Sequence, residues 1–90
     1  MHADKTKVIR LLKTAQGQID GLIKMIEDNR YCIDISTQIL SSQSILKKVN
    51  LEILQGHLEY CIKESFESNN EADKEQKIQE LIKIVNKLLK

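Results

Sequence analysis

The sequence predicts an all-α protein with three helices in each chain. Its 90 residues include no proline and only three glycines, and apolar residues recur at intervals of three and four positions. That interval is the period of an amphipathic helix, and leucine, isoleucine and lysine are abundant, as in helical bundles. Residues 1–90 are therefore expected to form a single domain. A chain this short buries little apolar surface without a partner.

The first helix is expected near residues 5–27. Gly17 lies inside this segment, where a glycine indicates close packing rather than a break. The following Asp28-Asn29-Arg30 segment supplies capping and turn residues. The assignment rests on apolar residues with helical spacing, namely Val8, Leu12, Ala15, Ile19, Leu22 and Ile26.

A second, long helix is expected near residues 32–66, where Gly56 is the only glycine. Several serines in its first half are mediocre helix formers, so tertiary contacts are expected to stabilise them. A last helix is expected near residues 72–89, preceded by a capping box from Ser68 to Glu71. The regularly spaced residues of the second helix are Cys32, Ile35, Ile39, Ser42, Leu46, Val49, Ile53, Leu58, Ile62 and Phe66.

A long central helix with two shorter neighbours leaves apolar surface that one chain cannot cover. Pairing the central helices of two chains would give an antiparallel four-helix bundle, built from the first two helices of each chain. The third helix would then pack near the ends of the bundle. The sequence therefore predicts a homodimer at least.

Three residues with soft metal-binding side chains lie on the predicted central helix. His57 and Cys61 are four positions apart and so share one helix face. Cys32 lies 25 positions before His57, which is roughly 37 Å along a continuous helix. One chain therefore cannot close a three-ligand site, whereas two antiparallel chains can.

Two thiolates and one imidazole suit Cu(I), with Zn(II) as the main competitor. Cu(I) accepts three ligands in a plane, whereas Zn(II) would need a fourth. His2 is near the N-terminus, far from these residues along the chain, and no other Cys or His is present. The donor set therefore favours Cu(I). A saturated site leaves no open catalytic position, and no catalytic motif is evident, so we expect no enzyme.

The formal net charge is only +1, so charge alone is weak evidence for a nucleic-acid partner. Basic residues nevertheless cluster at the start of the first helix, where only Asp4 opposes them. Repeated across an oligomer, this cluster could bind phosphates, although it could equally be a solvated helix face. Its members are Lys5, Lys7, Arg10 and Lys13.

The sequence resembles the CsoR family of bacterial metal-sensing repressors over nearly its whole length. The resemblance implies an all-α dimer that assembles into a tetramer, with a Cys from one protomer and a His and a Cys from the other at each site. Cys32, His57 and Cys61 are similar to the ligands of the copper-sensing branch. Nickel/cobalt and formaldehyde sensors generally differ at the last position, and persulfide sensors lack the His. The matching segments are Asn29-Arg30-Tyr31-Cys32-Ile33-Asp34-Ile35, Gln38-Ile39, Gly56-His57-Leu58-Glu59-Tyr60-Cys61, Gly17-Gln18 and Glu80-Leu81-Ile82.

The resemblance also implies roles for residues outside the ligand set. Tyr31 and Glu80 match outer-shell positions, where a carboxylate can hydrogen-bond the free N–H of the ligand histidine. Lys47 and Lys48 match a basic DNA contact. The Arg that usually contacts DNA six residues before the Gly-Gln pair is replaced by Leu11. A basic neighbour cannot be assumed to substitute, because a shift of one residue rotates a helical side chain by about 100°.

Together these observations predict a Cu(I)-responsive repressor that binds operator DNA without copper and is released when copper binds. Two alternatives remain: a persulfide or thiol sensor of the same family that uses Cys32 and Cys61, and a copper-binding protein without DNA binding. No apolar run is long enough to span a bilayer and no signal-peptide core is evident, so a cytoplasmic location is expected. The candidate DNA contacts are Arg10, Lys13, Lys47 and Lys48.

Overall fold

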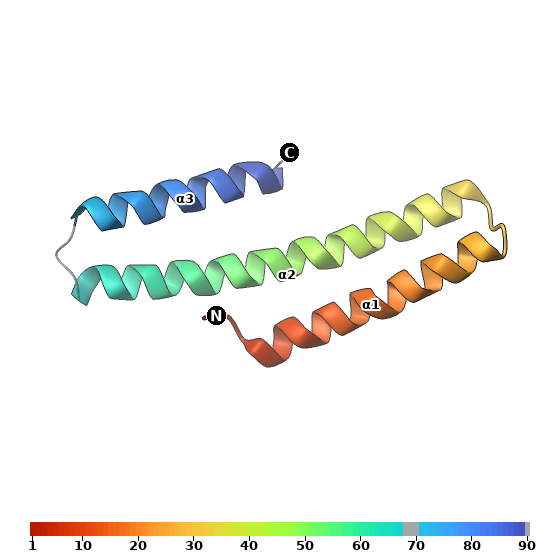
Figure 1. The fold of residues 1–90 in the computed structure, drawn as a ribbon, viewed down its shortest axis with the longest axis horizontal. Coiled ribbons are helices and arrows are strands. Elements are labelled where there is room, and N and C mark those ends of the chain that lie inside the picture. The colour runs from red at the N-terminus through yellow and green to blue at the C-terminus, as the bar shows by residue number, and fades with distance from the viewer. Residues whose placement is uncertain (68–70, 90) are drawn as a thin grey trace.

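The computed structural model describes residues 1–67 and 71–89, and this part of the chain consists of three α-helices without a strand (Figure 1). Helix α1 spans Lys5–Glu27, α2 spans Cys32–Glu67 and α3 spans Glu71–Leu89. Both α1 and α3 run antiparallel to α2 and pack against it. The predicted fold class and the three helices are confirmed. The expected capping residue Ser68 lies outside the described residues.

Local signals define both ends of α1. Asp4 has an extended backbone conformation, and its carboxylate accepts a hydrogen bond of 3.2 Å from the backbone N–H of Lys7. This N-cap satisfies one of the free N–H groups of the first turn. At the other end, Asn29 adopts a left-handed conformation with φ of 54°, which asparagine tolerates better than most residues. The chain thus reverses direction within a few residues before α2 begins.

One stripe of α1 packs against α2. Val8, Ala15 and Leu22 are buried, and Leu11 and Gln18 between them are half-buried. These positions alternate in steps of three and four, as the seam of two packed helices requires. This stripe is called the seam below.

The middle of α2 is stabilised by a polar contact within the seam. Ser42 is only 5 % exposed, and its hydroxyl donates a hydrogen bond of 2.9 Å to Oε1 of Gln18 on α1. Thr37 and Ser44 instead donate to the backbone carbonyls one turn earlier, at 2.8 and 3.1 Å. Their hydroxyls are therefore satisfied within the helix. The expectation that tertiary contacts support this serine-rich stretch is confirmed at Ser42.

A second apolar stripe on α1 is exposed. Leu12, Ile19 and Ile26 belong to the helical pattern from which the first helix was assigned, and they are 42 %, 44 % and 58 % exposed. Leu12 and Ile19 each follow a half-buried seam residue by one position, so they point about 100° away from it. One chain therefore covers only one of the two apolar stripes of α1, which agrees with the expectation that a single chain leaves apolar surface uncovered. The exposed stripe continues on α2 with Ile39 and Leu46.

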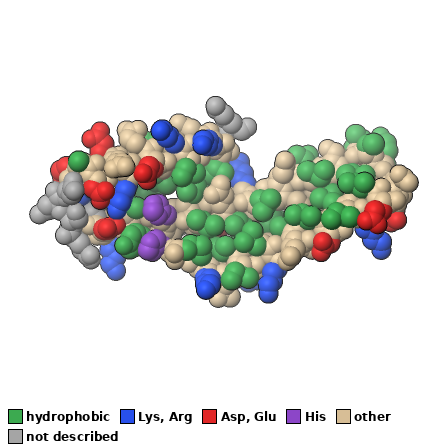
Figure 2. All heavy atoms as spheres, in the orientation of Figure 1, with side chains coloured by type: hydrophobic (Ala, Val, Ile, Leu, Met, Phe, Trp, Pro, Cys, Tyr) green, Lys and Arg blue, Asp and Glu red, His purple; other side chains and the backbone are tan. Residues whose placement is uncertain are grey.

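The close packing expected at Gly17 is not found within this chain, because a Cβ there would meet nothing within 4 Å. The molecule measures 59 × 28 × 12 Å. Much of its apolar surface is visible in Figure 2 as a long green band across all three helices. None of the helices, over the residues described, is long and apolar enough to cross a membrane.

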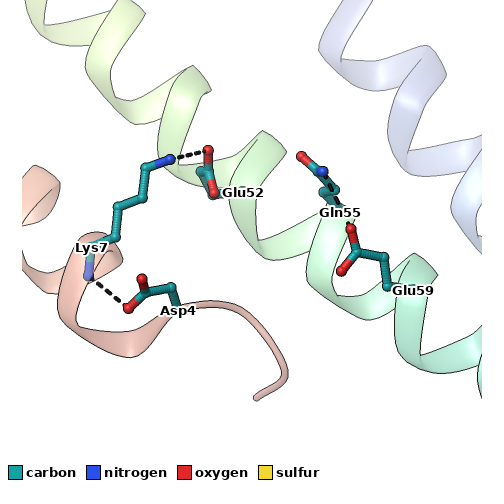
Figure 3. Close-up of polar contacts among 5 residues, drawn as sticks. All are labelled: Asp4, Lys7, Glu52, Gln55 and Glu59. Atoms are coloured by element: carbon teal, nitrogen blue, oxygen red, sulfur yellow. Dashed lines mark hydrogen bonds and ion pairs between the residues drawn. The ribbon is translucent and has the colours of Figure 1, made fainter.

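The α1–α2 register is fixed by contacts at two heights. Lys7 reaches across to Glu52, with Nζ 2.8 Å from Oε1 (Figure 3), and Gln18 meets Ser42 further along. Each step forward along α1 therefore corresponds to a step backward along α2. This register places the residues that precede α1 beside the stretch of α2 around residue 57.

Replacing the N-cap tests how much the start of α1 depends on it. Asp4→Ala is expected to lower the free energy of unfolding by about 1 kcal/mol, because it leaves a backbone N–H of the first turn without its partner. Urea unfolding at a fixed protein concentration measures the change. Asp20→Ala, at an exposed position within α1, is the control and should change stability by less than about 0.5 kcal/mol. Equal effects in the two variants would contradict the capping role.

Candidate metal centre

His57 and Cys61 lie next to each other on one face of α2. Cys61 Sγ is 3.4 Å from His57 Nε2, because side chains four residues apart in a helix are neighbours. Both line a cleft of about 310 Å³ between α2 and α3. A sulfur and an imidazole nitrogen at this distance can bind the same soft metal ion. The other residues that line the cleft are Leu58, Ile62, Lys74, Lys77, Ile78 and Leu81.

Cys32 is the first residue of α2, near the opposite end of the same helix. Its side chain is exposed, and the preceding Tyr31 is 67 % exposed. Because α2 is continuous between Cys32 and His57, the two residues are separated by roughly 37 Å of helix. Over residues 1–67 and 71–89, no three His, Cys, Asp or Glu side chains are placed to hold a metal ion. One chain thus brings together two of the three predicted ligands.

His2 lies beside His57, although its position in the sequence gave no reason to expect this. Its ring stacks on Tyr60, with centroids 3.6 Å apart and planes inclined by 6°, and its centroid is 6.4 Å from that of His57. Figure 2 shows the two histidines next to each other on one face of the molecule. His2 is therefore near the site in space although it is distant along the chain, and it is not placed to share a metal ion with His57 and Cys61. The position of His2 follows from the register of α1 against α2. The sequence alone does not specify this register.

Glu80, the predicted outer-shell carboxylate, is exposed on α3. Among the described residues it forms no hydrogen bond or ion pair with His57. Its neighbour Leu81 lines the cleft instead. The proposed hydrogen bond from His57 to Glu80 stays a prediction for the assembled protein.

Helix α3 is held against α2 by Lys77 at the edge of the cleft. Its Nζ lies 2.8 Å from Oε2 of Glu64 and 3.5 Å from Oδ2 of Asp73. The hydrogen bond to Glu64 raises the pKa of Lys77 above its ordinary value; desolvation partly opposes this, and the charge of Asp73 adds to it. Because the pKa is raised on folding, the stabilisation is complete at neutral pH and is lost only as the pH rises past that value.

The predicted DNA contacts on α1 and on α2 lie at the same height along the two packed helices. The Lys7–Glu52 and Gln18–Ser42 contacts place residues 10–13 opposite residues 47–50. Leu11, which stands where the family usually has Arg, is half-buried between two seam residues. The four candidate DNA contacts are all exposed: Arg10, Lys13, Lys47 and Lys48.

Comparison with known proteins identifies the family. Residues 4–87 match the family described as metal-sensitive transcriptional repressor, and the chain therefore belongs to that family. Its members regulate transcription and are not enzymes, which confirms the expected absence of catalysis. The predicted membership of the CsoR family is confirmed by the relatives and solved structures described next.

Two relatives illustrate the similarity. The copper-sensing transcriptional repressor CsoR of Bacillus subtilis (strain 168) is 36 % identical over 87 residues, covering 97 % of this chain and 83 % of that protein. CsoR of Mycobacterium tuberculosis (strain ATCC 25618 / H37Rv) is 39 % identical over 61 residues, which is 68 % of this chain. The matched part spans about half of the mycobacterial protein, 51 % of its length.

Two solved structures share the fold. The first is the copper-sensing repressor CsoR with Cu(I) from Geobacillus thermodenitrificans NG80-2, with a TM-score of 0.78, 33 % identity and coverage of 100 % of this chain and 94 % of that one. The second is the nickel-responsive transcriptional regulator InrS, with a TM-score of 0.77, 25 % identity and coverage of 98 % and 96 %. The same fold thus serves regulators of different metals, so the fold alone does not determine the metal.

Removing the Lys77 contacts tests whether they hold α3 in place. Lys77→Gln is expected to speed hydrogen exchange of α3 amides by at least about twofold, because an exposed ion pair contributes modestly to local stability. Exchange in α1 should not change. Lys83→Gln, on an exposed part of α3, is the control. Unchanged exchange in the Lys77 variant would show that apolar contacts alone hold the helix.

Proposed function

We propose that this metal-responsive repressor senses Cu(I). In this proposal residues 1–90 form one metal-sensing and DNA-binding domain, which binds operator DNA without copper. Cu(I) binding at an intersubunit site releases the DNA. The copper-sensing relatives in Bacillus and Mycobacterium and the Cu(I)-bound structural neighbour support the choice of metal. A repressor of this kind acts where the chromosome is, so we place it in the cytoplasm.

The observation that carries the proposal is the distance between the two ends of α2. His57 and Cys61 lie together near one end, and Cys32 starts the other. An unbroken helix cannot bring these ends together. A second, antiparallel α2 can present its own Cys32 to the His57–Cys61 pair. The proposed site therefore takes Cys32 from one subunit and His57 and Cys61 from its partner.

The exposed apolar stripe supports the assembly that this site needs. Leu12 and Ile19 of α1 and Leu46 of α2 line one continuous groove. Covering it with the same surface of a second chain gives an antiparallel four-helix bundle in which each subunit contributes α1 and α2. We propose this homodimer as the sensing unit and a dimer of dimers, a homotetramer, as the DNA-binding form.

The donor set fits copper. Two thiolates and one imidazole form a soft, three-coordinate set that suits Cu(I). Cys61 Sγ and His57 Nε2 already lie 3.4 Å apart, so this half of the site requires little rearrangement. Tyr31 would lie next to the third ligand, and Glu80 would fix the tautomer of His57 from α3 once the subunits assemble.

Phosphate binding is assigned to the exposed basic residues at one level of the α1–α2 pair. Their charges would attract the DNA backbone without reading its bases. Leu11 leaves this surface without the family's usual Arg, and Arg10 and Lys13 are the exposed basic residues that α1 offers near it. The proposed contacts are Arg10, Lys13, Lys47 and Lys48.

Mixed oligomers test the intersubunit site directly. Cys32→Ala and Cys61→Ala chains should each lose most of their Cu(I) binding. When refolded together, they should recover about a quarter of the wild-type capacity per chain, because half of the dimers are mixed and each carries one intact site. Anaerobic Cu(I) titration against a strong chelator measures the capacity.

A second mixture is the control for that experiment. His57→Ala and Cys61→Ala chains lack ligands from the same half of the site, so no arrangement of the two restores a complete set. This mixture should therefore bind no more copper than its components. If the first mixture also fails to recover binding, the ligands do not come from different subunits.

Operator titration tests the regulatory step. The affinity for the protein's own upstream DNA is expected to fall by about tenfold or more when Cu(I) is bound, within the usual range of coupling between two sites. Reciprocity requires that this DNA weaken Cu(I) binding by the same factor. Equal DNA affinity with and without copper would contradict the proposal. Absence of DNA binding in both states would favour a copper-binding protein without a role on DNA.

A persulfide or thiol sensor is the second candidate, because both cysteines are free thiols. In that function Cys32 and Cys61 of neighbouring chains would be linked by sulfur, and His57 would have no part. The contact between His57 and Cys61 favours the metal instead. Mass spectrometry after polysulfide treatment separates the two, since only the thiol sensor forms an interprotomer sulfur bridge as its inducing step.

A further inference from the structure

Helix α1 has a row of buried apolar residues with a flank of other side chains on each side of it. The row consists of Val8, Ala15 and Leu22. At about 100° per residue, Leu11 lies on one side of this row and Leu12 on the other. Gln18 and Ile19 repeat the two positions two turns later. The Leu11 flank therefore consists of Leu11 and Gln18, and the Leu12 flank consists of Leu12 and Ile19.

Apolar burial alone would favour packing of the Leu12 flank against α2. The two flanks each have one leucine, but the Leu12 flank adds an isoleucine where the Leu11 flank has an amide. Burial of apolar surface is the main favourable contribution to folding. The structure nevertheless half-buries both residues of the Leu11 flank and leaves both residues of the Leu12 flank exposed. An interaction other than apolar burial must therefore select the flank that faces α2.

A buried hydrogen bond on the Leu11 side provides that selection. The hydroxyl of Ser42, a residue that is only 5 % exposed, donates to Oε1 of Gln18 at 2.9 Å. The other acceptor of this hydroxyl, the carbonyl oxygen of Gln38 in the same helix, is more distant at 3.3 Å. Lys7 and Glu52 form an ion pair on the same side of α1 (Figure 3). Because both of these charged side chains remain partly exposed, their pair contributes less than the buried contact.

We propose that Gln18 and Ser42 are positioning residues, which fix the rotation of α1 on α2 and so keep the Leu12 flank free for a second chain. This rests on the homodimer proposed above, because Leu12 and Ile19 line the groove that the partner would cover. Without the hydrogen bond, α1 can turn until its own α2 covers these two side chains. The groove is then lost. The pair thus controls assembly although neither residue lines the groove.

The same rotation sets the direction of the basic side chains on α1. Arg10 and Lys13 are exposed on α1, whereas Lys47 and Lys48 are exposed on α2. Turning one helix therefore moves one half of the proposed DNA-binding surface relative to the other half. Loss of the hydrogen bond should weaken dimerisation and DNA binding together.

Replacement of Ser42 tests the proposal against a matched serine. Ser42→Ala removes the hydroxyl but introduces a better helix former, so the helix content measured by circular dichroism should be retained. Its dimer dissociation constant, measured by sedimentation over a dilution series, is expected to rise by about tenfold, since one buried hydrogen bond contributes a factor of this order. Its affinity for operator DNA should fall as well. Ser44→Ala should change neither quantity, because the exposed Ser44 donates to the carbonyl of Leu40 in its own helix.

A double-mutant cycle separates positioning from unrelated damage. Gln18→Ala should weaken dimerisation as much as Ser42→Ala does, and the double variant should be no weaker than either one, because all three lack the same hydrogen bond. Additive losses, or an unchanged dimer in Ser42→Ala, would overturn the proposal. A wild type that stays monomeric would refute the homodimer and this proposal with it. If the wild type dimerises without binding operator DNA, the proposed regulatory function fails, and the dimerisation cycle still decides the role of the pair.

Discussion

The unbroken length of α2 is the constraint on which the rest of this protein depends. A helix of 36 residues is a rod with a fixed rise per residue, so the distance between its functional groups is set by sequence position alone. Cys32 at one end and His57 with Cys61 near the other cannot meet within a chain. In the proposed intersubunit site, metal recognition and subunit association are therefore joined in one structural element.

The two apolar stripes of α1 differ in what they pack against. The seam stripe, with Val8 and Ala15, faces α2 of the same chain, and the stripe with Leu12 and Ile19 is free for a second chain. The buried Gln18–Ser42 hydrogen bond adds a polar contact to the seam, and such a contact favours one register over its neighbours. That register then determines which distant residues become neighbours, including the basic side chains on the two helices.

Local features were predictable from the sequence and tertiary ones were less so. The bounds of α1 follow from periodicity and from the turn residues Asp28-Asn29-Arg30, which act over a few residues. The buried face was only half predicted, because positions 11 and 12 are both leucine and periodicity cannot choose between adjacent apolar stripes. His2 was missed for a related reason: its place beside His57 depends on how two helices align, which no local motif encodes. The separation of Cys32 from His57, in contrast, needed only the helical rise.

The thinness of the molecule makes its stability depend on protein concentration. An extent of 12 Å along the shortest axis corresponds to a single layer of helices, and a lone chain has hardly any interior. In the proposed dimer such a layer would gain much of its stability from the second chain, so the folded fraction would rise with protein concentration. Dilution of the proposed dimer would then raise the unfolded fraction, which is the form that proteases cleave.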